Sequence, residues 1–347
     1  MNYTFTMTAT EIARAIRDKR LGVEEVTKAY IERIEEYDGT DGLNTVAELN
    51  NNAIAQAKKM DSTETDRSGA MFGLPVLIKD NIDVSGLHTT AGSFALADNI
   101  AGNDAHIVTN LRHNGALILG KTNMTEFANY TSNNMPGGYS SRGGQVRNAY
   151  NREKNPGGSS SGSAVAMSAG LCSAAVGTDT SFSIVGCATE NGVTGLKPSH
   201  GSLSSEGIIP IAKTLDSAGP ITYDLNDALL VYSCMKDEAL QPVEPMAPEN
   251  IHLAVNIFNC DEVSQAQLKR YDTVLNQLKS NRVKISEVVH ARTEYQRDIM
   301  HYEFRHDLEQ YLFHSKAQRR TLEEIVNYYE TNPDKMMKYG NDYLRGA

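Results

Sequence analysis

Three short apolar runs, separated by segments of helical periodicity, constrain the fold of this chain more than any other feature. They cover residues 74–79, 116–119 and 173–176. Short strands that alternate with helices are typical of an α/β protein, in which helices pack on both faces of a sheet. The first run ends at Lys79, so a strand that should be buried carries an ammonium group into the interior.

A glycine- and serine-rich segment, P-G-G-S-S-S-G-S-A, occupies residues 156–164. By itself this composition is more typical of a flexible linker than of an anion-binding turn. Gly157 and Gly158 also allow the backbone to pass close to a reacting group, which a side chain would prevent. The small residues that follow predict a helix at about 161–169 that can pack closely on the sheet.

Two further motifs lie in register with this segment, G-T-D at 177–179 and G-L-K-P at 195–198. Together with Lys79 they resemble the amidase signature family, whose nucleophile is a serine activated through a second serine by a lysine. On the family pattern Lys79 matches the general base, Ser159 the relay serine and Ser183 the nucleophile. The resemblance implies that no histidine takes part.

These residue types suit the chemistry. A serine hydroxyl needs a base, whereas an ordinary lysine, with a pKa of ~10.4, is protonated at neutral pH. Burial should lower the pKa of Lys79, because desolvation favours the neutral amine. Lys79 would then deprotonate Ser159, and Ser159 would deprotonate Ser183, in a variant of the serine triad. The resemblance also implies a cis peptide bond between Gly158 and Ser159.

The segment before the predicted nucleophile departs from the family pattern. Two small residues usually stand there, whereas this chain has Ser181 and Phe182. The resemblance implies that the backbone N–H groups of Thr180, Ser181 and Phe182, with that of Ser183, form an oxyanion hole. We expect Phe182 either to be strained, if the position requires a positive φ, or to intrude on the acyl pocket. Cys187 also replaces a usual proline.

The resemblance covers nearly the whole chain and implies a layered α/β/α amidase signature fold with a central mixed sheet. Residues 119–150 are similar to the branch that contains bacterial peptide amidases. Family members continue further, so the C-terminal part is expected to be missing. We interpret residues 1–347 as one domain, with an N-terminal helical arm (1–61), a catalytic half (62–240) and a truncated, peripheral helical half (250–347), the last two joined by a proline-containing linker.

Composition limits the partners. The chain has 33 basic and 43 acidic residues and a net charge of −10, without long blocks of like charge, which disfavours direct binding to nucleic acid or an anionic membrane. No signal-peptide pattern or transmembrane-length apolar run is present. Four cysteines without C-x-x-C spacing suit free thiols in a reducing cytoplasm. We therefore expect a cytoplasmic protein.

His301 and His306 lie five residues apart, not the three or four that place two ligands on one helical face, so no metal site is predicted. The resemblance implies no cofactor.

The sequence thus predicts an amidase that hydrolyses a carboxamide, a peptide C-terminal amide or a small amide, to an acid and ammonia through a serine acyl-enzyme. Two alternatives stay open. One is the A-type glutaminase subunit of a glutamyl-tRNA amidotransferase, which would need a partner protein. The other is a catalytically impaired, truncated homologue, because of Phe182 and the short C-terminus.

Overall fold

The chain divides into two compact units in its computed structural model, Met1–Ala239 with Asp298–Ala347, and Leu240–Arg297. The structure describes residues 4–62, 67–238, 245–256, 263–288 and 295–347. The larger unit thus combines most of the predicted peripheral half with the catalytic half. The interpretation of the whole chain as one domain stays a prediction.

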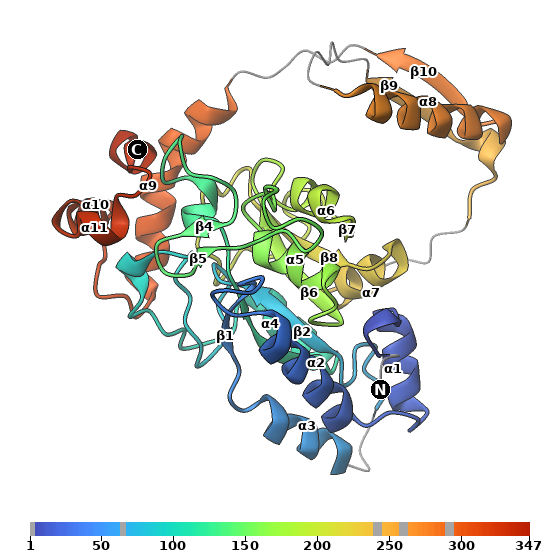
Figure 1. Ribbon diagram of the computed structural model, residues 1–347, viewed down its shortest axis with the longest axis horizontal. Helices are drawn as coiled ribbons and strands as arrows, with labels where there is room; N and C mark the ends of the chain where they lie inside the picture. The colour runs from blue at the N-terminus through green and yellow to red at the C-terminus, as the bar shows by residue number, and fades with distance from the viewer. Residues whose placement is uncertain (1–3, 63–66, 239–244, 257–262, 289–294) are drawn as a thin grey trace. The chain divides into compact units, whose positions relative to one another are not determined.

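A six-stranded mixed sheet forms the centre of the larger unit (Figure 1). In spatial order its strands are β1 (Val46–Leu49), β3 (Leu117–Thr122), β2 (Pro75–Lys79), β6 (Ala174–Asp179), β8 (Ser217–Thr222) and β7 (Thr194–Gly195). Strands β3, β2 and β6 are mutually parallel, and the other neighbours are antiparallel. These three parallel strands are the three apolar runs of the sequence, and every residue in them is buried. The predicted central mixed sheet is therefore confirmed.

The carboxyl ends of the parallel strands place the chemistry. Strand β2 ends at Lys79, which pairs with Thr122 at the end of β3, and β6 ends at Asp179. Parallel strands end at the same edge of a sheet, where ligands bind in open α/β folds. The loop that carries Ser183 begins directly after β6, at this edge.

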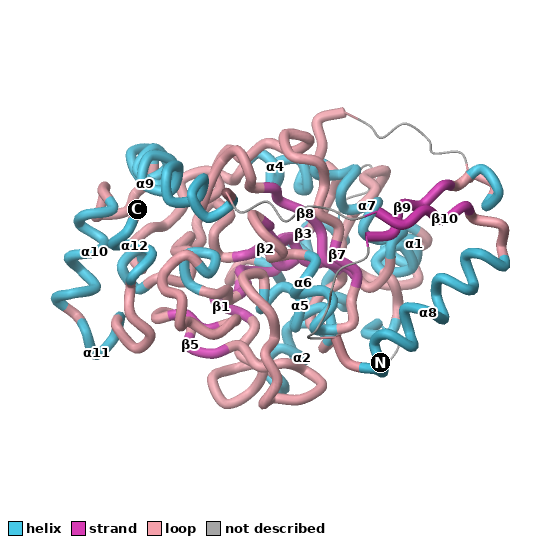
Figure 2. The backbone as a smooth tube through the Cα atoms, turned by 90° about the horizontal axis from the view of Figure 1, so that it is seen from above, coloured by secondary structure: helices cyan, strands magenta, loops and turns pink. Residues whose placement is uncertain are grey.

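Helices pack against the sheet in layers, and Figure 2 shows α4 on one side of the strands with α2 and α5 on the other. Helix α5 contacts β2, β3, β6 and β8, and α7 contacts β8. At Gly162 in α5 a Cβ atom would lie 2.3 Å from the backbone oxygen of Asn123, so a small residue is required for this close packing. The helices are α1 (Ala9–Arg17), α2 (Val23–Tyr37), α3 (Ala53–Ser62), α4 (His106–His113), α5 (Ser161–Ser168), α6 (Val185–Asn191) and α7 (Leu225–Met235).

Four C-terminal helices cover a second hydrophobic cluster: α9 (Gln296–His314), α10 (Leu322–Thr331), α11 (Pro333–Met336) and α12 (Asp342–Gly346). A buried carboxylate fixes this region to the catalytic part, because Glu126 accepts hydrogen bonds from the hydroxyl groups of Tyr329 and Ser141. Helix α9 also holds the chain before β8, since Asp307 accepts a 2.8 Å hydrogen bond from the N–H of Lys213. Several of the predicted tyrosines therefore pack here.

The smaller unit consists of β9 (His252–Asn256), α8 (Gln265–Ser280) and β10 (Lys284–Val288), in which the helix connects two parallel strands. This strand–helix–strand order is the one expected from the sequence. Of the predicted linker at 241–250, residues 241–244 lie outside the described residues. The remaining short elements are the 3-10 helices η1 (Thr4–Thr6), η2 (Phe94–Leu96), η3 (Glu126–Asn129) and η4 (Pro248–Asn250), and the strands β4 (Tyr139–Ser140) and β5 (Gly144–Gln145).

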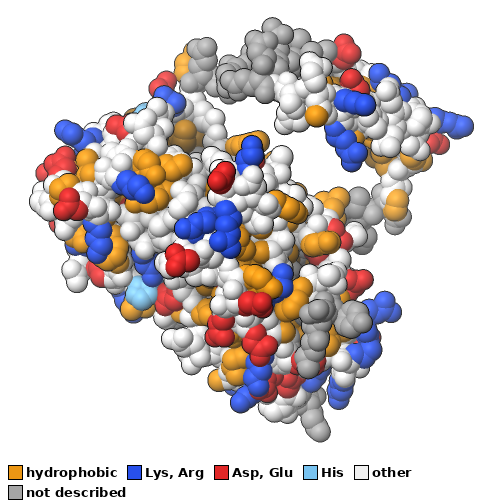
Figure 3. All heavy atoms as spheres, viewed as in Figure 1, with side chains coloured by type: hydrophobic (Ala, Val, Ile, Leu, Met, Phe, Trp, Pro, Cys, Tyr) orange, Lys and Arg blue, Asp and Glu red, His pale blue; other side chains and the backbone are white. Residues whose placement is uncertain are grey.

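Charged side chains of both signs are interspersed with hydrophobic ones on the face drawn in Figure 3. Within the described ranges, no helix combines the length and the apolar character needed to cross a bilayer. Three cysteines, Cys172, Cys187 and Cys234, are free and buried, and Cys260 lies outside the described residues.

Candidate active site

Lys79 is the centre of the site. Its side chain is fully buried, and Nζ donates hydrogen bonds to Ser159 Oγ at 2.8 Å, to Thr178 Oγ1 at 2.8 Å and to Thr178 O at 3.3 Å. Desolvation lowers the pKa of Lys79 to about 7, although the nearby groups of Cys187, Asp179 and Asp216 act in the opposite direction. No carboxylate among the described residues lies within ion-pair distance of Nζ. Lys79 can therefore lose its proton near neutral pH.

Ser159 precedes α5, and the Gly158–Ser159 peptide bond is cis, as the resemblance implies. The serine-rich segment is not a flexible linker, because Ser159 and the two serines after it are fully buried. The carbonyl of Ser159 accepts a hydrogen bond from Thr125 N at 3.1 Å. At Gly158 a Cβ atom would lie 2.7 Å from Thr125 Oγ1, so the glycine allows this close approach.

Ser183 lies in the loop between β6 and α6 and is 5% exposed. Its carbonyl accepts a 3.3 Å hydrogen bond from Ser160 N, which joins the two serine loops. The structure thus brings Lys79 and Ser159 into direct contact and places Ser183 against the residue after Ser159. The hydroxyl of Ser183 forms no hydrogen bond with another residue in the described part of the chain.

The loop from Ser181 to Ser183 offers unpaired donors. Across the described ranges, the backbone N–H groups of Ser181, Phe182 and Ser183 have no hydrogen-bond acceptor. Backbone donors without a partner are uncommon in folded proteins, and three in succession can converge on one anionic oxygen. The side chain of Thr180 is occupied, because its hydroxyl donates to Asp216 Oδ1 at 2.5 Å.

Phe182 adopts a φ of 75°, so the first of the two expected outcomes, a positive φ, is the one observed. Its side chain is 67% exposed and lies against Gly186 in α6, where a Cβ atom would be 2.3 Å from Phe182 Cδ1. Cys187 is buried against Gly157, and burial raises the pKa of its thiol to about 12. A glycine in α6 thus makes room for the aromatic side chain.

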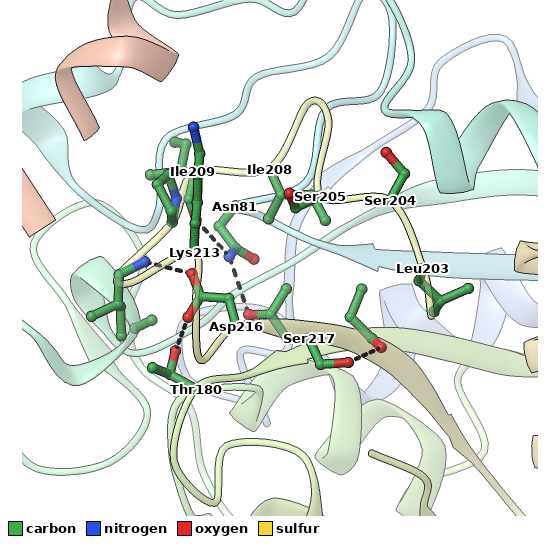
Figure 4. Close-up of a pocket in the computed structure, with 15 residues that line it drawn as sticks. Asn81, Thr180, Leu203, Ser204, Ser205, Ile208, Ile209, Lys213, Asp216 and Ser217 are labelled. Carbon is green, nitrogen blue, oxygen red and sulfur yellow. Dashed lines mark hydrogen bonds between the residues drawn. The ribbon is translucent and has the colours of Figure 1, made fainter. Parts of the chain in front are cut away.

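A pocket beside the site is lined by Asn81, Thr178, Thr180 and Asp216, and by the chain at 208–211 (Figure 4). It adjoins Lys79 through Thr178, which binds the lysine. Asn81 donates to Thr178 Oγ1 at 3.1 Å. Burial raises the pKa of Asp216 to about 6, and its carboxylate accepts hydrogen bonds from the N–H groups of residues 211 and 212.

Sequence reasoning missed Thr178 and Asp216 as parts of the site. Thr178 lies inside the G-T-D motif, next to a strand end, and this position was a usable signal. Asp216 has no local signal, because it reaches the site only through the antiparallel pairing of β8 with β6. Neither residue could be assigned a partner from spacing alone.

No three His, Cys, Asp or Glu side chains gather as metal ligands in the part of the chain that the structure describes. His301 instead contacts Tyr130, with 2.6 Å between Nδ1 and the phenol oxygen.

The chain is similar to several known proteins. It is 38% identical over 252 residues to a probable amidase of Arabidopsis thaliana, which covers 70% of this chain and 49% of that protein. It is 35% identical over 240 residues to the A-type subunit of the glutamyl-tRNA(Gln) amidotransferase of Clostridium kluyveri, with 68% and 47% covered. The chain therefore spans about half the length of these curated relatives.

Two solved structures share its fold. The peptide amidase of Stenotrophomonas maltophilia has a TM-score of 0.90 and 31% identity, with 98% of this chain and 74% of that chain covered. An amidase family protein of Bacillus anthracis has a TM-score of 0.92 and 31% identity, with 99% and 73% covered. The family model described as amidase matches residues 25–338. The chain therefore belongs to the amidase family, the family that its serine and lysine motifs resemble.

Proposed function

We propose that this protein is a hydrolase of carbon–nitrogen bonds in linear amides, with Lys79, Ser159 and Ser183 as general base, relay and nucleophile. The observation that carries the proposal is the contact of Lys79 with Ser159 at 2.8 Å, in surroundings that lower the lysine pKa to about 7. A base with a pKa near the working pH is the most effective proton acceptor.

The reaction follows from these positions. The neutral amine of Lys79 accepts the proton of Ser159, which accepts that of Ser183 as the latter attacks the amide carbonyl. The N–H groups of Ser181, Phe182 and Ser183 stabilise the negative charge on the carbonyl oxygen. The proton returns along the relay to the leaving nitrogen, ammonia departs, and water then releases the acid from the acyl-enzyme.

Peptide C-terminal amides and small amides are the substrates that we favour. The support is the similarity to the peptide amidase of Stenotrophomonas maltophilia over 98% of this chain. We further propose a reducing, cytoplasmic location, because the cysteines Cys172, Cys187 and Cys234 are free thiols.

A second candidate is the glutaminase component of an amidotransferase, favoured by the 35% identity to the amidotransferase protein of Clostridium kluyveri. In that case ammonia would pass to a partner enzyme, and the protein would co-purify with that partner. An amidase that acts alone should release ammonia without any partner.

A screen of carboxamides for ammonia release tests the proposal, with Ser183→Ala as the blank. Glutamine and a peptide amide belong in the same screen, because they separate the two candidates. Activity should rise with pH through about 7 as Lys79 loses its proton. Undiminished turnover in Ser183→Ala, or an optimum in acid, would contradict the mechanism.

A further inference from the structure

Lys197, in the G-L-K-P motif, has no part in the chemistry described so far. Its ammonium donates to Asp179 Oδ1 at 2.9 Å and to the carbonyl of Thr180 at 3.3 Å. The lysine side chain is 33% exposed, whereas the carboxylate of Asp179 is fully buried. A buried carboxylate needs a partner of opposite charge, and Lys197 is the ion-pair partner of Asp179 among the described residues.

Asp179 uses its second oxygen to hold the other end of the Ser183 loop. Oδ2 accepts hydrogen bonds from the N–H of Ile184 at 2.7 Å and of Val185 at 3.4 Å. The segment between these contacts is residues 180–183, which contains the nucleophile and the three unpaired N–H groups. Lys197 and Asp179 therefore fix both ends of the loop on which the proposed chemistry depends.

The same ion pair acts on Lys79. The charged or titratable groups that raise the pKa of Lys79 are Cys187 on α6, Asp179 on β6 and Asp216 before β8. Without the positive charge of Lys197, the carboxylate of Asp179 would favour the protonated form of Lys79 more strongly.

We propose that Lys197 is a positioning residue of the amide-hydrolysing site, which acts through Asp179 on the Ser183 loop and on the charge of Lys79. The inference rests on the function proposed above. It assigns to Lys197 a role in catalysis that is separable from stability.

The test uses the rate at which a fluorophosphonate labels Ser183, measured from pH 5.5 to 10. In this reaction Ser183 Oγ bonds to phosphorus, fluoride leaves, and the hydroxyl proton passes to the base, so no substrate needs to be known. In Lys197→Met we expect the midpoint of the pH profile to move upward by about one unit. We also expect the limiting rate at high pH to fall about 10-fold to 100-fold, because the loop is displaced.

Lys197→Arg keeps the charge and should restore the midpoint. Lys28→Met is the matched control, because it removes a lysine from a surface ion pair with Glu24 on α2. If Lys197→Met does not fold, Lys197→Gln replaces it, and the same upward midpoint shift is expected.

The outcomes separate the two proposals. Labelling that is equal in wild type and Ser183→Ala would overturn the proposed function and this inference with it. Labelling that depends on Ser183, with a midpoint and a limiting rate in the neutral Lys197 variant that match those of Lys28→Met, would overturn the role of Lys197 alone.

Discussion

Two fully buried lysines, Lys79 and Lys121, lie on the neighbouring strands β2 and β3. Burial lowers the pKa of both. Lys121 Nζ donates to the carbonyl oxygens of Ile82 at 2.6 Å and His88 at 2.9 Å, and lies 3.9 Å from Asp80 Oδ1. These partners only accept hydrogen bonds, so the surroundings of Lys121 require an ammonium.

The surroundings of Lys79 differ in this respect. Two of its partners are hydroxyl groups, those of Ser159 and Thr178, and a hydroxyl can accept a hydrogen bond from an ammonium or donate one to an amine. The absence of a carboxylate within ion-pair distance, among the described residues, removes the main reason for Lys79 to keep its proton. Burial alone does not make a lysine a base; the hydrogen-bonding character of its partners decides.

The largest expected effect is the loss of hydrolysis in Lys79→Met, on the order of 10⁴-fold or more, because members of a proton relay act as a unit. The fold should persist, since methionine fills a similar volume without a buried charge to solvate. Ammonia release and circular dichroism of the same preparation measure both. A loss of less than about 10-fold would mean that another group is the base and would end the contrast with Lys121.

The same substitution at the other lysine should act on stability instead. Lys121→Met leaves the buried carboxylate of Asp80 without its ammonium and two carbonyl groups without a donor. We expect a decrease of about 3–5 kcal/mol in the free energy of unfolding, measured by urea titration. If Lys121→Met is as stable as Lys79→Met, the two lysines do not differ in the way that their partners indicate.

The sequence predicted Lys79 but not the role of Lys121. An apolar run ending in a lysine, together with the G-G-S-S-S segment, was sufficient to identify the base and the parallel strands. Lys121 also follows an apolar run, but its partners come from residues 80–89, which reach it through the pairing of β2 with β3. The sign of φ at Phe182 likewise depends on how the loop closes, so the sequence left two alternatives there.

A smaller effect concerns the pH dependence of stability. The pKa of Lys79 is about 7 in the folded protein and ~10.4 in an unfolded chain, so the unfolded chain binds more protons between these values. The contribution of Lys79 should therefore make the free energy of unfolding rise with pH from about 7 to about 10, by at most ~1.4 kcal/mol per unit. Below pH 7 both states are protonated and this slope vanishes.

Urea titrations at pH 7.5 and 9.5 measure this slope as a difference between wild type and Lys79→Met, which cancels other titrating groups. The pKa of Lys121 is also lowered, so part of the rise should remain in Lys79→Met. An identical pH dependence in the two proteins would mean that Lys79 keeps its proton when folded, like Lys121.

The smallest effect concerns the loop beside Lys79, where Phe182 lies against Gly186. In the wild type, Gly186→Ala places a methyl group into the ring and should decrease the free energy of unfolding by about 1–3 kcal/mol. In Phe182→Gly the ring is absent, and the same substitution should be neutral or stabilising by up to ~1 kcal/mol, because alanine favours the helix over glycine. A double-mutant cycle by urea unfolding measures this change of sign. Equal effects in both backgrounds would mean that the ring does not occupy the space above Gly186, and Phe182 would then be free to turn toward the nucleophile and narrow the acyl side of the site.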